Sequence, residues 1–185
     1  GNFIVMTDSF SIHQNDDGGW QIQEGDIQSS LTFENMTMRY QDTMPPIEEA
    51  SGHATFDRNS ELLSVHVKEG RTHGLSIKHA DLEFAHIIEP KKGKADLYML
   101  LEGSLSDGLS FIQHDPIKAN HDFDLKQTRG ALDLVANLSF PTRKDLKVEQ
   151  IDMDIRGQAK DVVLPGVLQD LALEGGPFDI RVNND

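Results

Sequence analysis

The sequence predicts a mostly β protein, an elongated antiparallel sheet with one or two short helices. Apolar and polar residues alternate with a period of two over most of the chain, which is typical of strands with one wet face. Turn-forming residues separate the alternating segments at short intervals, as in successive hairpins. Strands do not alternate with long helical segments, so a doubly wound nucleotide-binding fold is not expected.

Residues 1–46 are expected to form an N-terminal β segment of hairpins, and residues 47–185 a β domain. Residues 15–19, Asn-Asp-Asp-Gly-Gly, predict a hairpin turn before Trp20. Two prolines, Pro45-Pro46, then predict a break between the two regions. Because the chain begins at Gly1 and enters an apolar run at once, we expect it to be an internal segment of a longer protein.

Within the second region, residues 57–60 and 89–93 are predicted hairpin turns. The apolar phase slips by one residue between Ile77 and Leu82, which predicts a β-bulge near His79-Ala80. Further breaks are expected at Pro141 and at Pro165-Gly166.

The clearest strand lies between residues 130 and 140, where apolar side chains at even positions share one face. Met153 and Ile155 are expected to continue this surface on a neighbouring strand. Six residues of the resulting stripe are the candidate apolar site: Leu132, Leu134, Leu138, Phe140, Met153 and Ile155.

One segment has helical spacing, residues 104–112, with Ser104 as the expected N-cap. A second short turn is expected around residues 167–170. Met36, Met38 and Met44 cluster in the sequence; ordinary core packing is favoured, and a soft lining for a lipid groove is the alternative.

The formal net charge is -14, from 31 acidic residues against 17 lysines and arginines. This charge argues against nucleic-acid partners and against docking on anionic membranes through a basic patch. The chain has no cysteine, so it forms no disulfide and offers no thiolate ligand. No apolar run approaches the roughly 20 residues that cross a bilayer.

No catalytic or cofactor motif is found, so no cofactor is expected and an enzyme is the least favoured class. Eight histidines are present, but none is spaced from another as His-x-His or His-x-x-x-His. The best cluster is His114-Asp115 with His121-Asp122 and Asp124, which is more simply a polar loop. We therefore expect no functional metal site.

Several phrases in a fixed order extend from Ile47 to Asn184: IEEASGHATFD, LLSVHVKEGRTHGLSIKHADLEF, LLEGSLSDGLSFIQHDPI, GALDLVANLSFPTRKDLKVEQIDMDIRGQAKDVVLPG and LALEGGPFDIRVNN. In this order they resemble the AsmA-like superfamily, particularly the large YhdP-type bacterial envelope proteins. The resemblance covers about three quarters of the chain, the size of one domain.

The resemblance implies a curved sheet with an apolar inner trough, similar to bridge-like lipid transfer proteins. Such proteins are anchored in the bacterial inner membrane, extend through the periplasm and carry phospholipid toward the outer membrane. The implied partners are phospholipid and flanking segments of the same protein. The family offers no catalytic residues to carry over.

Two other functions stay open. The first is a structural, scaffolding β domain whose apolar face is a closed core. The second is a carbohydrate- or surface-binding β-sandwich, although aromatic residues make up only 6% of the chain. The conduit and the scaffold differ in whether the apolar face is open or filled.

Overall fold

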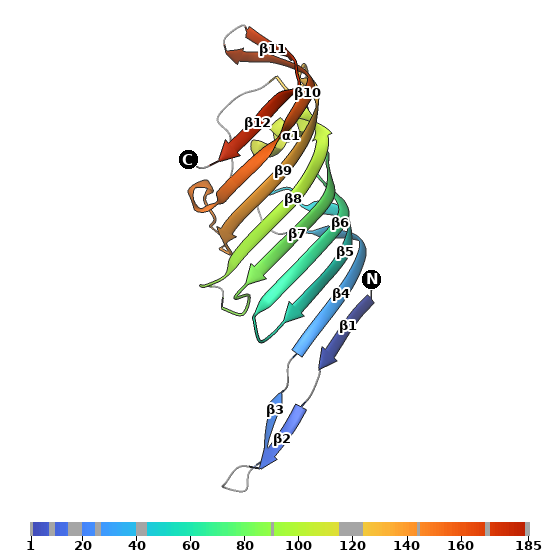
Figure 1. The fold of residues 1–185 in the computed structure, drawn as a ribbon, viewed down its shortest axis with the longest axis vertical. Helices are drawn as coiled ribbons and strands as arrows, with labels where there is room; N and C mark the ends of the chain where they lie inside the picture. Colours follow the sequence, from blue (N-terminus) through green and yellow to red (C-terminus); the bar gives the residue numbers. More distant parts are fainter. Residues whose placement is uncertain are drawn as a thin grey trace.

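In the computed structural model, the described residues form one ten-stranded sheet, a two-stranded hairpin and a short helix (Figure 1). The structure describes residues 2–7, 10–14, 20–24, 27–39, 44–89, 91–114, 124–143, 145–168 and 171–183. The predicted fold class, an elongated and curved antiparallel sheet with a short helix, is confirmed.

The described elements follow one another in a simple order. They are β1 Asn2–Thr7, β2 Phe10–Gln14, β3 Trp20–Glu24, β4 Ile27–Met38, β5 Ile47–Asp57, β6 Leu62–Thr72, β7 Leu75–Ala85, β8 Lys94–Ser104, α1 Leu105–Ile112, β9 Arg129–Pro141, the 3-10 turn Val148–Gln150, β10 Asp152–Leu168, β11 Leu171–Gly175 and β12 Phe178–Asn183.

The strands from β4 to β10 form a meander in which each pairs antiparallel with the next. β1 pairs with β4 at one edge, and β2 pairs with β3 in the separate hairpin. β10 has 17 residues, and its outer edge is shared: its first half pairs with β12 and its second half with β11. The sheet therefore has β1 at one edge and the β11 and β12 strands at the other.

The structure has turns at most of the positions predicted from the sequence. Residues 58–61 connect β5 to β6, and residues 86–93 connect β7 to β8, with Pro90 outside the described residues. The pairing of β7 with β8 shifts register between Ile77 and His79, which confirms the predicted bulge. The hairpin of β2 and β3 is confirmed, while its turn at residues 15–19 lies outside the described residues.

The predicted break at Pro165-Gly166 is wrong, because β10 continues through it to Leu168. Its pairing with β11 shifts register between Leu164 and Leu168, so Pro165 stands at an irregularity where its missing N–H is tolerated. The predicted helical turn at 167–170 is wrong where it is described. Leu168 is still in strand and pairs with Leu171, and residues 169–170 lie outside the described part.

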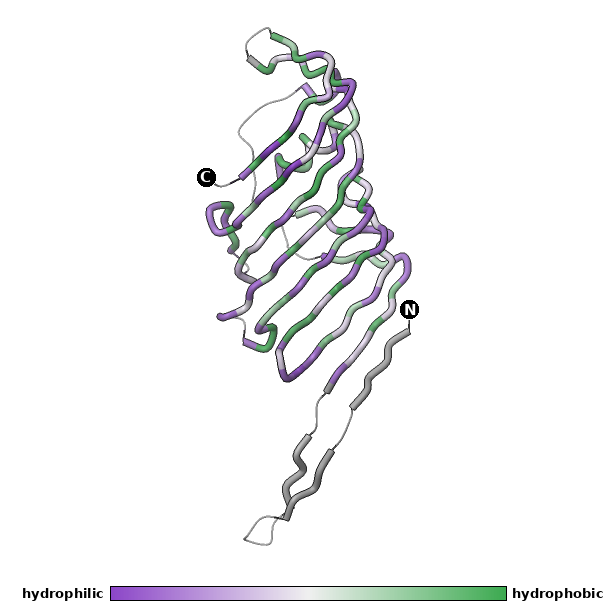
Figure 2. Tube along the Cα trace, in the orientation of Figure 1, coloured by the Kyte–Doolittle hydropathy of each residue, from purple (hydrophilic) through white to green (hydrophobic). Residues whose placement is uncertain are grey.

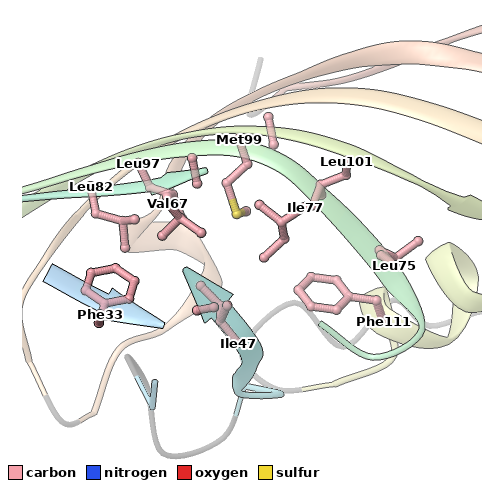
Figure 3. Packing of buried hydrophobic residues seen from close by; sticks show 13 residues of the cluster. Phe33, Ile47, Val67, Leu75, Ile77, Leu82, Leu97, Met99, Leu101 and Phe111 are labelled. Carbon is pink, nitrogen blue, oxygen red and sulfur yellow. The ribbon is translucent and has the colours of Figure 1, made fainter. Parts of the chain in front are cut away.

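Hydrophilic and hydrophobic residues alternate along the strands (Figure 2), which places them on opposite faces of the sheet. The apolar face carries the main core cluster, which includes Val67, Ile77 and Met99, all at most 4% exposed. Figure 3 shows these side chains turned toward Ile47 at the start of β5 and Phe111 of α1. The single layer buries this part of its apolar face by curling and by docking the helix.

Helix α1 begins as the sequence predicts. The Ser104 side chain accepts a hydrogen bond of 3.1 Å from the backbone N–H of Asp107, and its hydroxyl donates to the Asp107 carboxylate at 2.6 Å. This is an N-cap, which satisfies a backbone donor that the first turn leaves unpaired. Leu105 and Phe111 are the buried residues of the helix. The cap therefore fixes where the helix leaves β8 and lies against the apolar face.

β4 pairs with β5 from Gln28↔Asp57 to Met38↔Ile47, so the sheet is continuous across the predicted boundary at residue 46. The boundary itself stays a prediction. Among the described residues, no helix is long and apolar enough to cross a membrane.

Candidate functional site

An apolar cavity of about 270 Å³ lies between α1 and the strands β8, β9, β10 and β12, with Leu75 at the start of β7 also in its lining. Its lining consists of apolar side chains and Gly108. The cavity reaches β12 at the sheet edge, where Val182 is 45% exposed. Next to the filled core of β4 to β8, the sheet thus keeps an apolar space that protein side chains leave unfilled.

All six residues of the predicted apolar stripe line this cavity: Leu132, Leu134, Leu138, Phe140, Met153 and Ile155. The strand pairing brings them together. Leu138 on β9 stands opposite Leu97 of β8 and Met153 of β10, and Ile155 stands opposite Ala136. Because directly opposed residues project from the same face, the stripe continues from strand to strand.

The six residues are not equivalent. Leu132 is only 4% exposed and belongs to a second buried cluster with Leu105 of α1. A β-carbon at Gly108 would lie 2.4 Å from Leu132 Cδ2, so the helix packs directly on this leucine. The other five residues are half-buried. Leu132 therefore anchors the helix, whereas the others form the wall of the space.

Gly157 makes room for Leu134. The two residues are directly opposite in the pairing of β9 with β10. A β-carbon on Gly157 would lie 2.7 Å from Leu134 Cδ2 and 2.0 Å from the Asp133 carbonyl oxygen. With hydrogen in that place, Leu134 can lie over the backbone of β10 at the cavity wall.

Sequence reasoning missed several parts of the lining. Ile180 and Val182 follow an alternating pattern on β12, and Leu109 and Ile112 lie at helical spacing on α1, so their pattern carried a signal. Others come from less regular segments: Leu146, Ile151 and Met44. Met36, Met38 and Met44 pack against the main core, as the favoured interpretation predicts, and Met44 also lines the cavity.

A polar contact ties α1 to the turn between β6 and β7. His73 Nε2 lies 2.8 Å from Ser110 Oγ, and the rings of His73 and His114 meet edge to face at 4.5 Å. Burial is the largest cause that lowers the pKa of His73, and the charge of His114 lowers it further, while Asp107 acts in the opposite direction. The neutral imidazole therefore fits this position best.

The opposite, polar face of the sheet carries a broad groove of about 490 Å³ across β5 to β10. At its β5 end, Asp81 lies between two histidines: Asp81 Oδ1 is 2.7 Å from His66 Nδ1, and Asp81 Oδ2 is 2.7 Å from His79 Nε2. The hydrogen bond from His66 is the largest cause that lowers the pKa of Asp81. Of the five-residue cluster predicted around His114, only His114 and Asp124 are described.

No family model, no curated protein and no solved structure matches the chain. The resemblance to AsmA-like proteins therefore stays a prediction, as do the periplasmic location and the inner-membrane anchor.

Proposed function

We propose that this chain shelters the acyl chains of phospholipid in its apolar cavity, as one segment of a periplasmic lipid-transfer protein. The observation that carries the proposal is the cavity wall, because five strands and a helix contribute only apolar side chains and one glycine to it. Binding pockets for polar small molecules place a few polar groups to orient the ligand. A wall without them fits a ligand recognised by its hydrocarbon alone.

The dimensions suit such a ligand. The volume of about 270 Å³ lies just below the range of ligand pockets, ~300–1,000 Å³. The part of β9 that lines the cavity, Leu132 to Phe140, extends over about 26 Å at ~3.3 Å per residue. One leaflet's acyl layer is about 15 Å thick, half of a hydrocarbon core of ~30 Å. The wall is thus longer than an acyl chain, and the headgroup can stay in water beyond its end.

The remainder of the molecule is consistent with this function. The formal net charge of -14 keeps a body with an apolar trough soluble. Flanking segments of the same protein are the expected partners at the two sheet edges, where unpaired backbone groups otherwise invite aggregation.

The competing proposal is a scaffold domain, and one observation favours it. Between β4 and β8 the apolar face is filled by its own side chains, Ile47 and Phe111 among them. If the cavity beside α1 were only a packing defect in that core, charge placed in it would destabilise the fold strongly. The two proposals therefore predict different consequences for the same substitution.

Phe140→Asp separates them. Phe140 lines the cavity, is half-buried and belongs to neither of the two core clusters of the described residues. The lipid proposal expects a folded protein that no longer binds a phospholipid with a fluorescent acyl chain, because an ionised group among hydrocarbon is strongly unfavourable. Binding is measured by fluorescence titration and folding by circular dichroism and thermal unfolding.

Val135→Asp is the matched control. Val135 lies on the same strand but faces the polar side, opposite Leu100 of β8 and Arg156 of β10. We expect this variant to bind the probe like the wild type. A folded Phe140→Asp variant that still binds the probe would contradict the lipid proposal, and a large fall of its melting temperature alone would favour the scaffold.

A further inference from the structure

Three histidines and one aspartate meet on the polar face, on the opposite side of the sheet from the apolar cavity. His53 of β5 is directly opposite His66 of β6, and His66 is directly opposite Asp81 of β7. His79 precedes Asp81 by two residues and so shares its face. The meander thereby assembles on three strands a cluster that is dispersed in the sequence.

The potential ligand atoms of His66, His79 and Asp81 all lie within 4.8 Å of one another. His66 Nδ1 and His79 Nε2 already point at the two oxygens of a single carboxylate, each at 2.7 Å. Two imidazole nitrogens and a carboxylate within this distance are a donor set for a divalent transition metal. A bound cation would replace the two hydrogen bonds by metal–ligand bonds.

We propose that His66, His79 and Asp81 form a binding site for a divalent cation of borderline softness, with Zn²⁺ as the expected occupant. Imidazole suits zinc, copper and nickel, whereas calcium and magnesium prefer sites built from oxygen alone. Three protein ligands leave the fourth position of a tetrahedral zinc ion for water or a further side chain.

His53 is placed to supply that fourth ligand. Its ring centroid lies 5.0 Å from that of His66, and its side chain is exposed, so a change of rotamer is sterically open. On the other flank, Tyr98 of β8 meets the ring of His79 edge to face at 5.9 Å. Tyr98 thus packs against the imidazole of His79, while the imidazole of His53 can approach the site from the other flank.

The site is accessible from solvent, and an ion bound there would link neighbouring strands. The side chains of His66 and Asp81 are 31% and 50% exposed, so a hydrated cation reaches them from solvent. Once bound, the ion connects β6 to β7, and through His53 also β5. A cross-strand link of this kind stabilises the fold by binding only the folded state.

The test is a zinc titration of the full chain without a histidine tag, followed by calorimetry. We expect one zinc ion per chain and a melting temperature that rises with zinc concentration. Since loss of outer partners of metal ligands already weakens binding by ~10–100-fold, His79→Ala and Asp81→Asn are expected to weaken it by about 100-fold or more.

His86→Ala is the control, because His86 is an exposed histidine outside the cluster whose Nδ1 lies 3.7 Å from a Glu61 oxygen. It should bind zinc like the wild type. Circular dichroism without metal shows whether each variant folds. The proposal is overturned if the wild type binds no zinc, or if folded His79→Ala and Asp81→Asn variants bind as tightly as the His86→Ala control.

Discussion

Gly157 illustrates how a single residue shapes the cavity wall. It stands opposite Leu134 in the sheet, and the space that a β-carbon would need is taken by the Asp133 carbonyl oxygen and by Leu134. Gly52 has the same role in the main core, where a β-carbon would lie 3.0 Å from Phe33 Cζ. In both places, a large apolar side chain lies over the backbone of the neighbouring strand.

Gly157→Ala is therefore expected to destabilise the protein by about 1–3 kcal/mol, because the added carbon meets backbone rather than a mobile side chain. Urea unfolding monitored by circular dichroism measures the change. Gly70→Ala is the comparison, since its nearest neighbour would be Ile47 Cγ2 at 3.2 Å. An equal loss of stability in the two variants would argue against the backbone clash as the cause.

The histidine cluster shows what sequence reasoning could not see at the residue scale. His53, His66 and His79 are too far apart along the chain to suggest a ligand set, so the sequence predicts no metal site. The predicted turn at 57–60 indicates which two strands pair and so bears on whether His53 and His66 meet. A hairpin closed there places His53 opposite His66, but only if its exact register is known, and a slip of one residue would send them to opposite faces.

At the scale of elements, α1 decides how far the apolar face is filled. It packs on Leu132 through Gly108, closes one side of the cavity through Leu109, and is held at the β6–β7 turn by the contact between His73 and Ser110. The charged and titratable groups facing His73 there are His114 and Asp107. The helix is thus attached by apolar packing, in which Leu105 and Phe111 are buried, and by the polar contact at His73.

The polar contact predicts a pH dependence. Folding lowers the pKa of His73 below its usual value near 6.5. The contribution of neutral His73 to the stability of the fold is therefore complete above pH 6.5 and is lost as the pH falls through the lower, folded-state pKa. Amide hydrogen exchange in α1, corrected for its intrinsic pH dependence, should therefore show weaker protection under mildly acidic conditions. His73→Gln, which keeps a polar group but does not titrate, should flatten this dependence.

His86→Gln is the control for that experiment, because His86 is exposed and lies in the turn after β7. It should leave the pH dependence of α1 protection unchanged. If His73→Gln also retained the full pH dependence, the contact between His73 and Ser110 would not be its origin.

Elements were predictable where the signal is local. The N-cap at Ser104, the turn after Asp57 and the bulge before His79 all follow from residues within a few positions of one another. The break predicted at Pro165 is wrong because it depends on a partner that is not local in the sequence. Whether a proline ends a strand depends on how its neighbours pair, and the pairing of β10 with β11 is irregular there. The stripe of six apolar residues was predictable because period-two patterning fixes a face.

At the scale of the whole molecule, the sheet is one layer with an apolar and a polar face. The apolar face is closed by its own residues over β4 to β8 and keeps a cavity toward β12. No pattern in the sequence predicts which part of the apolar face is filled and which part keeps a cavity. This depends on how the sheet curls to bring Ile47 and Phe111 into the same cluster (Figure 3). Long-range curvature of this kind is a property of the assembled sheet.

The far end of the molecule supports the expectation of flanking partners. β11 is exposed along its length, and Leu171 and Leu173 on it are 64% and 38% exposed. Apolar side chains on a sheet edge are a liability unless something covers them. In our proposal, the next segment of the same protein continues the trough from this edge.

Native mass spectrometry of the intact chain purified from bacterial cells tests whether the cavity beside α1 holds acyl chains. The lipid proposal predicts protein ions carrying additional mass equal to that of cellular phospholipids, lost in the Phe140→Asp variant and retained in Val135→Asp. Folded wild-type protein that carries no phospholipid, both as purified and after incubation with phospholipid vesicles, would contradict it.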